Sequence, residues 1–150
     1  MGGAIARARR PELEVVTAGT HVVEGMPMSW RTRDALAAVG YRADGHRSTQ
    51  LREEDLAGAD LVIAMACEHV AYVRRKHPEA AARTATLKRL ARDLADGDTP
   101  LADRLAKLAL DTVELEPWED VPDPAGGELE DFEACVREVD RLLAQVLPRC

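Results

Sequence analysis

The sequence predicts an α/β fold, a doubly wound parallel sheet covered by helices, and two observations lead to it. The run DLVIAM at Asp60–Met65 is almost continuously apolar, which is typical of a strand buried on both faces of a parallel sheet. Strand-like runs of this kind alternate along the chain with amphipathic helical patterns, as they do in α/β proteins. A chain of 150 residues can bury a sizeable core, so we expect residues 1–150 to form one domain.

In the first half of the chain, helices are predicted at Met1–Arg10 and Trp30–Val39. Strands are predicted at Glu14–Thr17 and Asp60–Met65. Pro11 closes the first helix, because proline cannot continue it. Ser29 can cap the second helix, and Gly40 supplies the left-handed residue that ends it. Leu36 and Val39 are expected on its buried side.

The second half of the chain continues the alternation. We expect a helix at Glu68–His77, a strand at Thr84–Leu87 that runs into a helix through Asp96, and a helix from Pro100 to about Leu110. The last helix has the clearest pattern, an apolar stripe at three- and four-residue steps: Phe132, Val136, Val139, Leu143 and Val146.

Composition and charge exclude several classes of protein. Acidic residues outnumber basic ones by 27 to 20, and the resulting net charge of −7 argues against nucleic acid or an anionic membrane as a partner. The three cysteines form no disulfide framework, and neither a secretory pattern nor an apolar run of membrane-spanning length is present. We therefore expect a cytoplasmic protein without a cofactor. The sequence leaves its oligomeric state undetermined.

Four short stretches carry a family resemblance: TAGT at Thr17–Thr20, GHRSTQL at Gly45–Leu51, ADLVIAM at Ala59–Met65 and the pair Asp123–Pro124. In this order and at these separations they resemble the low-molecular-weight protein tyrosine phosphatases, over roughly Met1 to Leu147. The resemblance implies a three-layer sheet and a phosphate loop, C-x5-R-[ST]-P, between the first strand and the first helix. It also implies a phosphorylated protein or a small phosphomonoester as the substrate.

The resemblance further implies a mechanism with one residue that this chain supplies. A cysteine thiolate displaces the alcohol of a phosphomonoester, and water later hydrolyses the phosphocysteine. Asp123 matches the acid that donates a proton to the leaving oxygen, and Pro124 would stiffen its loop. From the local sequence alone, Asp123 could simply be a turn residue, because Asp-Pro starts many turns.

Three further residues receive roles through the resemblance. Thr17 and His46 would support the phosphate loop by packing and hydrogen bonds, and Leu51 would line the substrate pocket, although a core leucine is the alternative. Relatives that act on phosphotyrosine tend to carry aromatic residues directly after the Asp-Pro pair. Ala125 and Gly126 stand there instead, so a phosphomonoester other than phosphotyrosine is a plausible substrate.

None of the three cysteines is expected to be the nucleophile. Six residues instead of five separate Cys67 from Arg74, Arg137 is too close to Cys135, and Cys150 ends the chain. Cys67 and Cys135 are interpreted as small apolar core residues. We likewise expect no metal site, because Cys67, His69 and His77 lack the spacing of zinc ligands.

We therefore expect an N-terminally truncated phosphatase that lacks the first strand and the nucleophile loop and is inactive as given. In such a fold the first strand lies between Glu14–Thr17 and Ala59–Met65. Each buried backbone group that it leaves unpaired would cost roughly 1 to 3 kcal/mol. The alternative is a noncatalytic, phosphatase-like binding domain, whose sheet rearranges or takes a strand from a partner.

Overall fold

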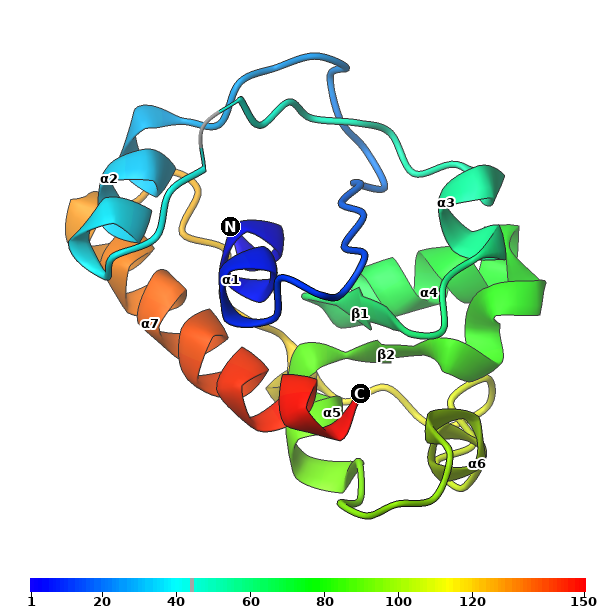
Figure 1. The fold of residues 1–150 in the computed structure, drawn as a ribbon. Coiled ribbons are helices and arrows are strands. Elements are labelled where there is room, and N and C mark those ends of the chain that lie inside the picture. The colour runs from blue at the N-terminus through cyan, green and yellow to red at the C-terminus, as the bar shows by residue number, and fades with distance from the viewer. Residues whose placement is uncertain (44) are drawn as a thin grey trace. The chain divides into compact units, whose positions relative to one another are not determined.

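The computed structural model of the protein describes residues 1–43 and 45–150 (Figure 1). These residues divide into two compact units. The first unit comprises residues 1–51 and 122–144, and the second comprises residues 52–121 and 145–150. The expectation of one domain over residues 1–150 stays a prediction.

The first unit is built from three helices, α1 (Gly2–Arg9), α2 (Trp30–Ala38) and α7 (Leu129–Val146), of which α7 extends two residues into the second unit. Ser29 caps α2 as predicted, since its hydroxyl accepts a hydrogen bond from the backbone N–H of Thr32 at 3.2 Å. Gly40 follows the helix with φ of 85°, a conformation that favours glycine. Leu36 is fully buried, whereas Val39 is only half-buried.

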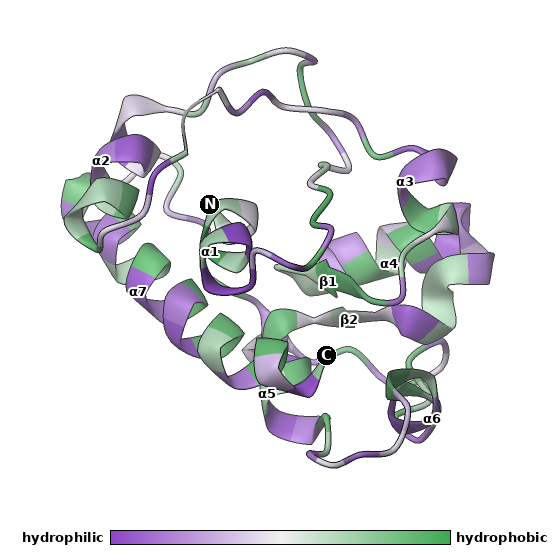
Figure 2. Cartoon of the chain, in the orientation of Figure 1, coloured by the Kyte–Doolittle hydropathy of each residue, from purple (hydrophilic) through white to green (hydrophobic). Residues whose placement is uncertain are grey.

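The predicted apolar stripe of α7 is confirmed, because all five of its members are buried: Phe132, Val136, Val139, Leu143 and Val146. Figure 2 shows α7 with apolar and polar residues alternating in bands along the helix. Within the first unit, Arg9 of α1 binds Asp140 of α7 through two hydrogen bonds, of 2.7 and 3.0 Å. The same carboxylate accepts a short hydrogen bond from the hydroxyl of Tyr41.

The predicted strand at Glu14–Thr17 is wrong. Among the described residues this segment forms no strand, and the nearest pairing is an isolated parallel bridge between Gly19 and Gln50. Val16 is 57% exposed, as a side chain is when no neighbouring layer covers it. The apolar pattern was correct for a strand, but a strand requires a ladder partner, and the described residues provide none along this segment.

The second unit contains the two strands that the structure describes, β1 (Val62–Ala64) and β2 (Thr84–Thr86). They pair in parallel, with Ile63 opposite Ala85. The remaining elements are α3 (Glu53–Ala57), α4 (Cys67–Lys76), α5 (Leu87–Asp93), α6 (Leu101–Ala106) and three 3₁₀ turns, η1 (Pro78–Arg83), η2 (Pro117–Glu119) and η3 (Leu147–Arg149). Because α4 links β1 to β2, these elements form the βαβ unit expected of an α/β protein (Figure 1).

The helices of the second unit begin near their predicted positions, but two of them end early. The helix predicted to run to about Leu110 ends at Ala106, and Ala109 adopts φ of 48°, a left-handed conformation in which a right-handed helix cannot continue. The helix predicted to reach Asp96 ends at Asp93. In the part of the chain that the structure describes, no helix combines the length and the apolar character needed to cross a bilayer.

Candidate active site

Asp123 lies at the start of a tight, ordered turn that leads into α7. Its Oδ1 accepts a hydrogen bond from the backbone N–H of Ala125 at 3.0 Å, and Gly127 N–H donates to the carbonyl of Pro124 at 2.9 Å. Gly126 completes the turn with φ of 86°. Asp123 is exposed, and no hydrogen bond to its Oδ2 is found among the described residues. The turn thus fixes one oxygen of the carboxylate and leaves the other accessible.

The thiol of Cys135 is part-buried next to Met1. The pKa of this thiol is raised by burial and by the negative charges of Glu138 and Asp123, and the ammonium group of Met1 opposes that effect. Cys135 Sγ lies 3.6 Å from the sulfur of Met1.

Thr17 packs against the same turn of α1. A β-carbon added at Gly3 would lie 2.1 Å from the methyl group of Thr17, so glycine is required there by close approach of the two segments. The carbonyl of Thr17 accepts a hydrogen bond from Thr49 Oγ1 at 3.3 Å. Thr17 therefore contributes its methyl group to packing and its carbonyl to the link with residues 49–51.

His46 is affected by three positive charges. Its imidazole is half-buried, and burial lowers its pKa, with further lowering by the charges of the Met1 ammonium, Arg7 and Arg47. The ring is consequently held in its neutral form over more of the physiological pH range than a free histidine.

Leu51 connects to this region through its backbone. Its N–H donates to the carbonyl of Gly19 at 2.8 Å, and its side chain is half-buried. The structure thus packs Thr17 against Gly3 of α1 and ties Leu51 to the segment that follows Thr17. The charge of the Met1 ammonium acts on His46, and the charge of Asp123 acts on the Cys135 thiol.

Cys67 is held as a donor and is poorly suited to nucleophilic attack. Its thiol donates to the carbonyl of Glu116 at 3.2 Å, and burial together with the neighbouring Asp120 raises its pKa to about 11. A thiolate is the reactive form, and this environment disfavours it.

Cys135 requires a correction to the sequence interpretation, which considered only Arg137. Cys135 and Arg141 do have the C-x5-R spacing, but both lie inside α7. At 1.5 Å per residue their Cα atoms are about 9 Å apart along the axis, and the backbone N–H groups between them are used within the helix. They form no phosphate cradle, and Leu142 stands where the motif has Ser or Thr.

A buried ionic network in the second unit was not predicted from the sequence. It lies in the residues that precede the turn at Asp123. Glu119 is completely buried and accepts from Arg89 Nε at 2.9 Å, Thr86 Oγ1 at 2.8 Å and the Glu116 N–H at 2.8 Å. Asp120 accepts from the Cys67 N–H at 2.6 Å. Apart from Glu116, the partners lie about 30 or more positions away in the chain, so the sequence does not reveal the network.

The network anchors the stretch from which the acid turn departs. Val121 is buried and donates its N–H to the carbonyl of Met65 at the end of β1, at 2.8 Å.

No group of three His, Cys, Asp or Glu side chains in residues 1–43 and 45–150 could hold a metal ion.

Comparison with known proteins identifies the family of this arrangement. Residues 1–108 match the family model described as low molecular weight phosphotyrosine protein phosphatase. A protein-arginine-phosphatase of Geobacillus stearothermophilus is 30% identical over 133 residues, which span 89% of this chain and 74% of the relative. The low molecular weight protein-tyrosine-phosphatase Etp of Escherichia coli K12 is 32% identical over 84 residues, 56% of this chain and 57% of the relative.

Solved structures agree with the sequence comparisons. A low molecular weight protein tyrosine phosphatase from T. tengcongensis has a TM-score of 0.77 at 28% identity, covering 99% of this chain and 88% of that one. An arginine phosphatase from Geobacillus stearothermophilus has a TM-score of 0.76 at 28% identity, covering 98% and 80%. The α/β fold described above is therefore the fold of these phosphatases.

Proposed function

Since the chain belongs to the low molecular weight phosphotyrosine protein phosphatase family, we propose that it supplies the fold and the general acid, Asp123, of a protein phosphatase. The observation that carries this proposal is the state of the Asp123 carboxylate. One oxygen is fixed by the turn, and the side chain is exposed. An acid so placed can protonate the leaving oxygen of a phosphomonoester as the P–O bond breaks.

The other three residues have supporting roles in the proposal. Thr17 and His46 position the start of α1, through the contact with Gly3 and through the neutral imidazole respectively. Leu51 lines the substrate pocket. The location of the protein in the cytoplasm stays our prediction.

The nucleophile is the part of the chemistry that the three cysteines do not supply. The Cys67 thiol is engaged with a carbonyl and has a raised pKa, and Cys135 lies within α7. We therefore expect the 150-residue chain alone to release no nitrophenol from p-nitrophenyl phosphate. A strand followed by C-x5-R-[ST]-P, fused to the N-terminus, would supply a thiolate and an arginine.

The test uses the chain extended by such a fused segment. In the extended protein, Asp123→Asn should lower kcat by about 10²- to 10⁴-fold, because a positioned general acid contributes that much. The loss should be larger for phenyl phosphate than for p-nitrophenyl phosphate, since the poorer leaving group depends more on protonation. Glu130→Gln removes an exposed charge from α7 and serves as the matched control.

Two outcomes would contradict the assignment. One is hydrolysis by the 150-residue chain that survives Asp123→Asn. The other is an Asp123→Asn loss no larger than that of Glu130→Gln, with both leaving groups affected alike.

The substrate class has two candidates. The family description favours phosphotyrosine in proteins, whereas the 30% identity to a protein-arginine-phosphatase over 89% of the chain favours phosphoarginine. The absence of an aromatic residue at Ala125 and Gly126 agrees with the second candidate, since no ring flanks a phenyl group there. Matched phosphotyrosine and phosphoarginine peptides, compared by kcat/KM with the extended protein, separate the two.

A noncatalytic function remains the alternative proposal. The same scaffold would then bind a phosphorylated partner without hydrolysing it. It becomes the better proposal if the extended protein binds a phosphorylated peptide without hydrolysing it.

A further inference from the structure

The turn that carries Asp123 is held mainly by its own hydrogen bonds, because Asp123, Ala125 and Gly126 are exposed. The bonds run from the Ala125 N–H to Asp123 Oδ1 and from the Gly127 N–H to the carbonyl of Pro124. An exposed turn with few buried contacts opens readily unless the chain at its ends is fixed. The direction of the Asp123 carboxylate therefore depends on how the chain is held where it enters α7.

Asp131 holds the chain at this entry to α7. Its Oδ2 accepts a hydrogen bond from the backbone N–H of Glu128 at 2.9 Å, and its own N–H donates to the carbonyl of Glu128 at 3.2 Å. A carboxylate in the first turn of a helix satisfies a backbone donor that has no partner within the helix, and the helix dipole favours its charge there. The next residue, Phe132, is buried and anchors Asp131 from below.

The same carboxylate also covers the backbone of Gly127. A β-carbon added at Gly127 would lie 2.4 Å from Asp131 Oδ2 and 3.0 Å from Asp131 Cβ, so glycine is required there by close approach. Gly127 is the residue whose N–H closes the turn onto Pro124. The Asp131 side chain thus contacts both residues that connect the turn to α7.

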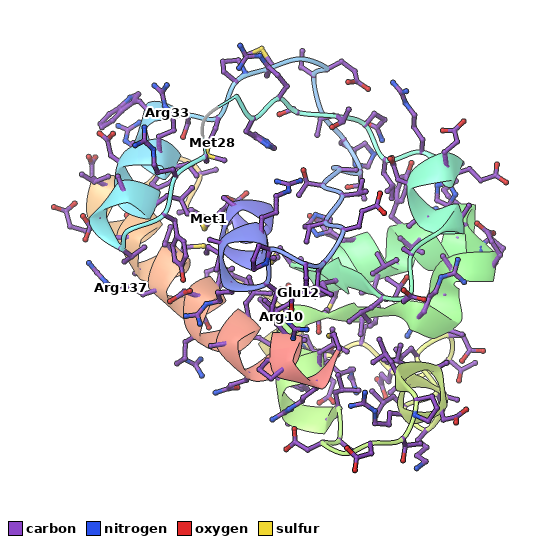
Figure 3. All side chains as sticks on the ribbon, in the orientation of Figure 1. Met1, Arg10, Glu12, Met28, Arg33 and Arg137 are labelled. Atoms are coloured by element: carbon purple, nitrogen blue, oxygen red, sulfur yellow. The ribbon has the colours of Figure 1, made fainter. Side chains whose placement is uncertain are left out.

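A second carboxylate of α7 is used differently. Glu133 accepts a hydrogen bond from Arg137 Nη2 at 2.5 Å, four residues further along the helix. Figure 3 shows Arg137 on the outer side of α7. An i,i+4 pair of this kind adds only a little to the stability of a helix. Glu133 therefore offers a matched control, a carboxylate that supports α7 through a contact along its surface.

We propose that Asp131 is a positioning residue for Asp123, since its side chain fixes Gly127 and Glu128 and thereby the turn that directs the acid. The catalytic part of this role rests on the proposed function of Asp123, whereas the mechanical link rests on the contacts alone. A general acid must hold its proton within hydrogen-bond reach of the leaving oxygen, and a displacement of about 1 Å can cost roughly 10²-fold in rate. A change at Asp131 should therefore slow proton transfer without weakening the binding of substrate.

The first test measures the mechanical link in the 150-residue chain, by NMR exchange of backbone amides with solvent. Asp131→Ala should speed exchange at Ala125 and Gly127 by roughly 2- to 30-fold, the range produced by loss of a helix-capping side chain. Asp131→Asn keeps an acceptor oxygen and should restore most of the protection. Glu133→Ala should leave both amides unchanged. The amide of Val139, in the middle of α7, reports general unfolding and should exchange equally in all variants.

A second variant tests the contact from the other side. Gly127→Ala should displace the Asp131 carboxylate and speed exchange at Ala125 in the same way as Asp131→Ala. When the two changes are combined, Gly127→Ala should add little, because the side chain that it meets is gone. Effects that multiply in the double variant would overturn the contact, as would unchanged exchange at Ala125 and Gly127 in Asp131→Ala.

The catalytic part is tested in the chain extended by the fused segment. Asp131→Ala should lower kcat for phenyl phosphate by roughly 3- to 30-fold, with KM little changed and a smaller loss for p-nitrophenyl phosphate. Asp131→Asn should restore most of the rate, and Glu133→Ala should leave it unchanged. The double variant Asp123→Asn/Asp131→Ala should be no slower than Asp123→Asn, because the position of an absent acid has no effect.

The two arms separate failure of the positioning role from failure of the proposed function. If Asp123→Asn is without specific effect, the general acid is wrongly assigned, and the amide exchange still decides whether Asp131 holds the turn. If Asp123→Asn slows the reaction as expected, two results overturn the role of Asp131. One is an Asp131→Ala loss that is equal for both leaving groups, and the other is a double variant whose loss is the product of the two single losses.

Discussion

The two units of the molecule each contain an arginine–carboxylate pair with two parallel hydrogen bonds, and the pairs differ in burial. In the second unit, the side chains of Arg89 and Glu119 are 6% and 0% exposed. In the first unit, those of Arg9 and Asp140 are 33% and 25% exposed. The same chemical pairing therefore operates in a nearly dry environment in one unit and beside water in the other.

The difference determines what each pair contributes. Burial by itself disfavours the ionised form of Glu119, yet the hydrogen bonds from Arg89, the Glu116 N–H and Thr86 together hold the pKa of this carboxyl below its usual value. The pKa of Asp140 is also lowered, chiefly by its hydrogen bond from Arg9. Breaking a buried pair strands a charge, whereas water can replace a partner at the surface.

The largest expected effect follows from removal of the buried charge. Glu119→Gln keeps the shape but leaves the Arg89 guanidinium without its carboxylate, which should reduce the free energy of unfolding by about 3 to 5 kcal/mol. Urea unfolding monitored by circular dichroism measures it. Glu116→Gln is the control, because Glu116 lies 3.8 Å from Arg89 and is half exposed. A loss below about 1 kcal/mol would show that the network is not a stabilising anchor.

The two pairs should also differ in how much stability the protein loses at acid pH when each is removed. A carboxyl whose folded-state pKa is depressed adds stability above its unfolded pKa and loses it as the pH falls toward the folded pKa. For Glu119 and Asp140 the loss should begin near their ordinary values of 4.5 and 3.8 and continue below them. In a pH series of urea midpoints, Glu119→Gln should flatten this acid limb more than Asp140→Asn does. The opposite order would contradict the ranking of the two pairs.

An intermediate effect is expected where the first unit depends on close packing. Gly3→Ala places a β-carbon against the methyl group of Thr17 and should cost about 1 to 3 kcal/mol, the usual range for overpacking. Thr17→Ser removes that methyl group, so the double variant should recover most of the loss. Thermal unfolding of the two single variants and the double variant gives the coupling. Additive losses would mean that the two residues do not meet.

The smallest effect is expected from the exposed pair. Asp140→Asn should lower the free energy of unfolding by about 1 kcal/mol or less, and added salt should shrink the difference. A double-mutant cycle with Arg9→Gln isolates the pair from the Tyr41 hydrogen bond. An effect as large as that of Glu119→Gln would remove the distinction between the two units.

Segments whose signals are local were predictable from the sequence. Ser29 and Gly40 mark the two ends of α2. The apolar stripe of α7 specified both the helix and its buried face. The apolar run at Asp60–Met65 predicted β1 in the same way. Amphipathic periodicity and capping act within a few residues, so they can be recognised without knowledge of distant contacts.

Segments whose state depends on distant partners were not predictable. Glu14–Thr17 has the pattern of a strand but forms none, because a ladder needs a neighbour that the local pattern does not reveal. Glu119 carries a charge that the sequence alone places at the surface. Its burial depends on Thr86 and Arg89, which are 33 and 30 positions away.

The sequence by itself determined most of the helical segments, the position of the strand β1 within residues 60–65 and the family to which the chain is similar. Only the tertiary structure decided that Glu119 is a buried anchor, that Cys135 and Arg141 share a helix and that Gly3 meets Thr17. The physical reason is the range of the forces. Backbone propensity and periodic burial act between neighbours in the chain, whereas ion pairing and close packing depend on which distant residues the fold brings together.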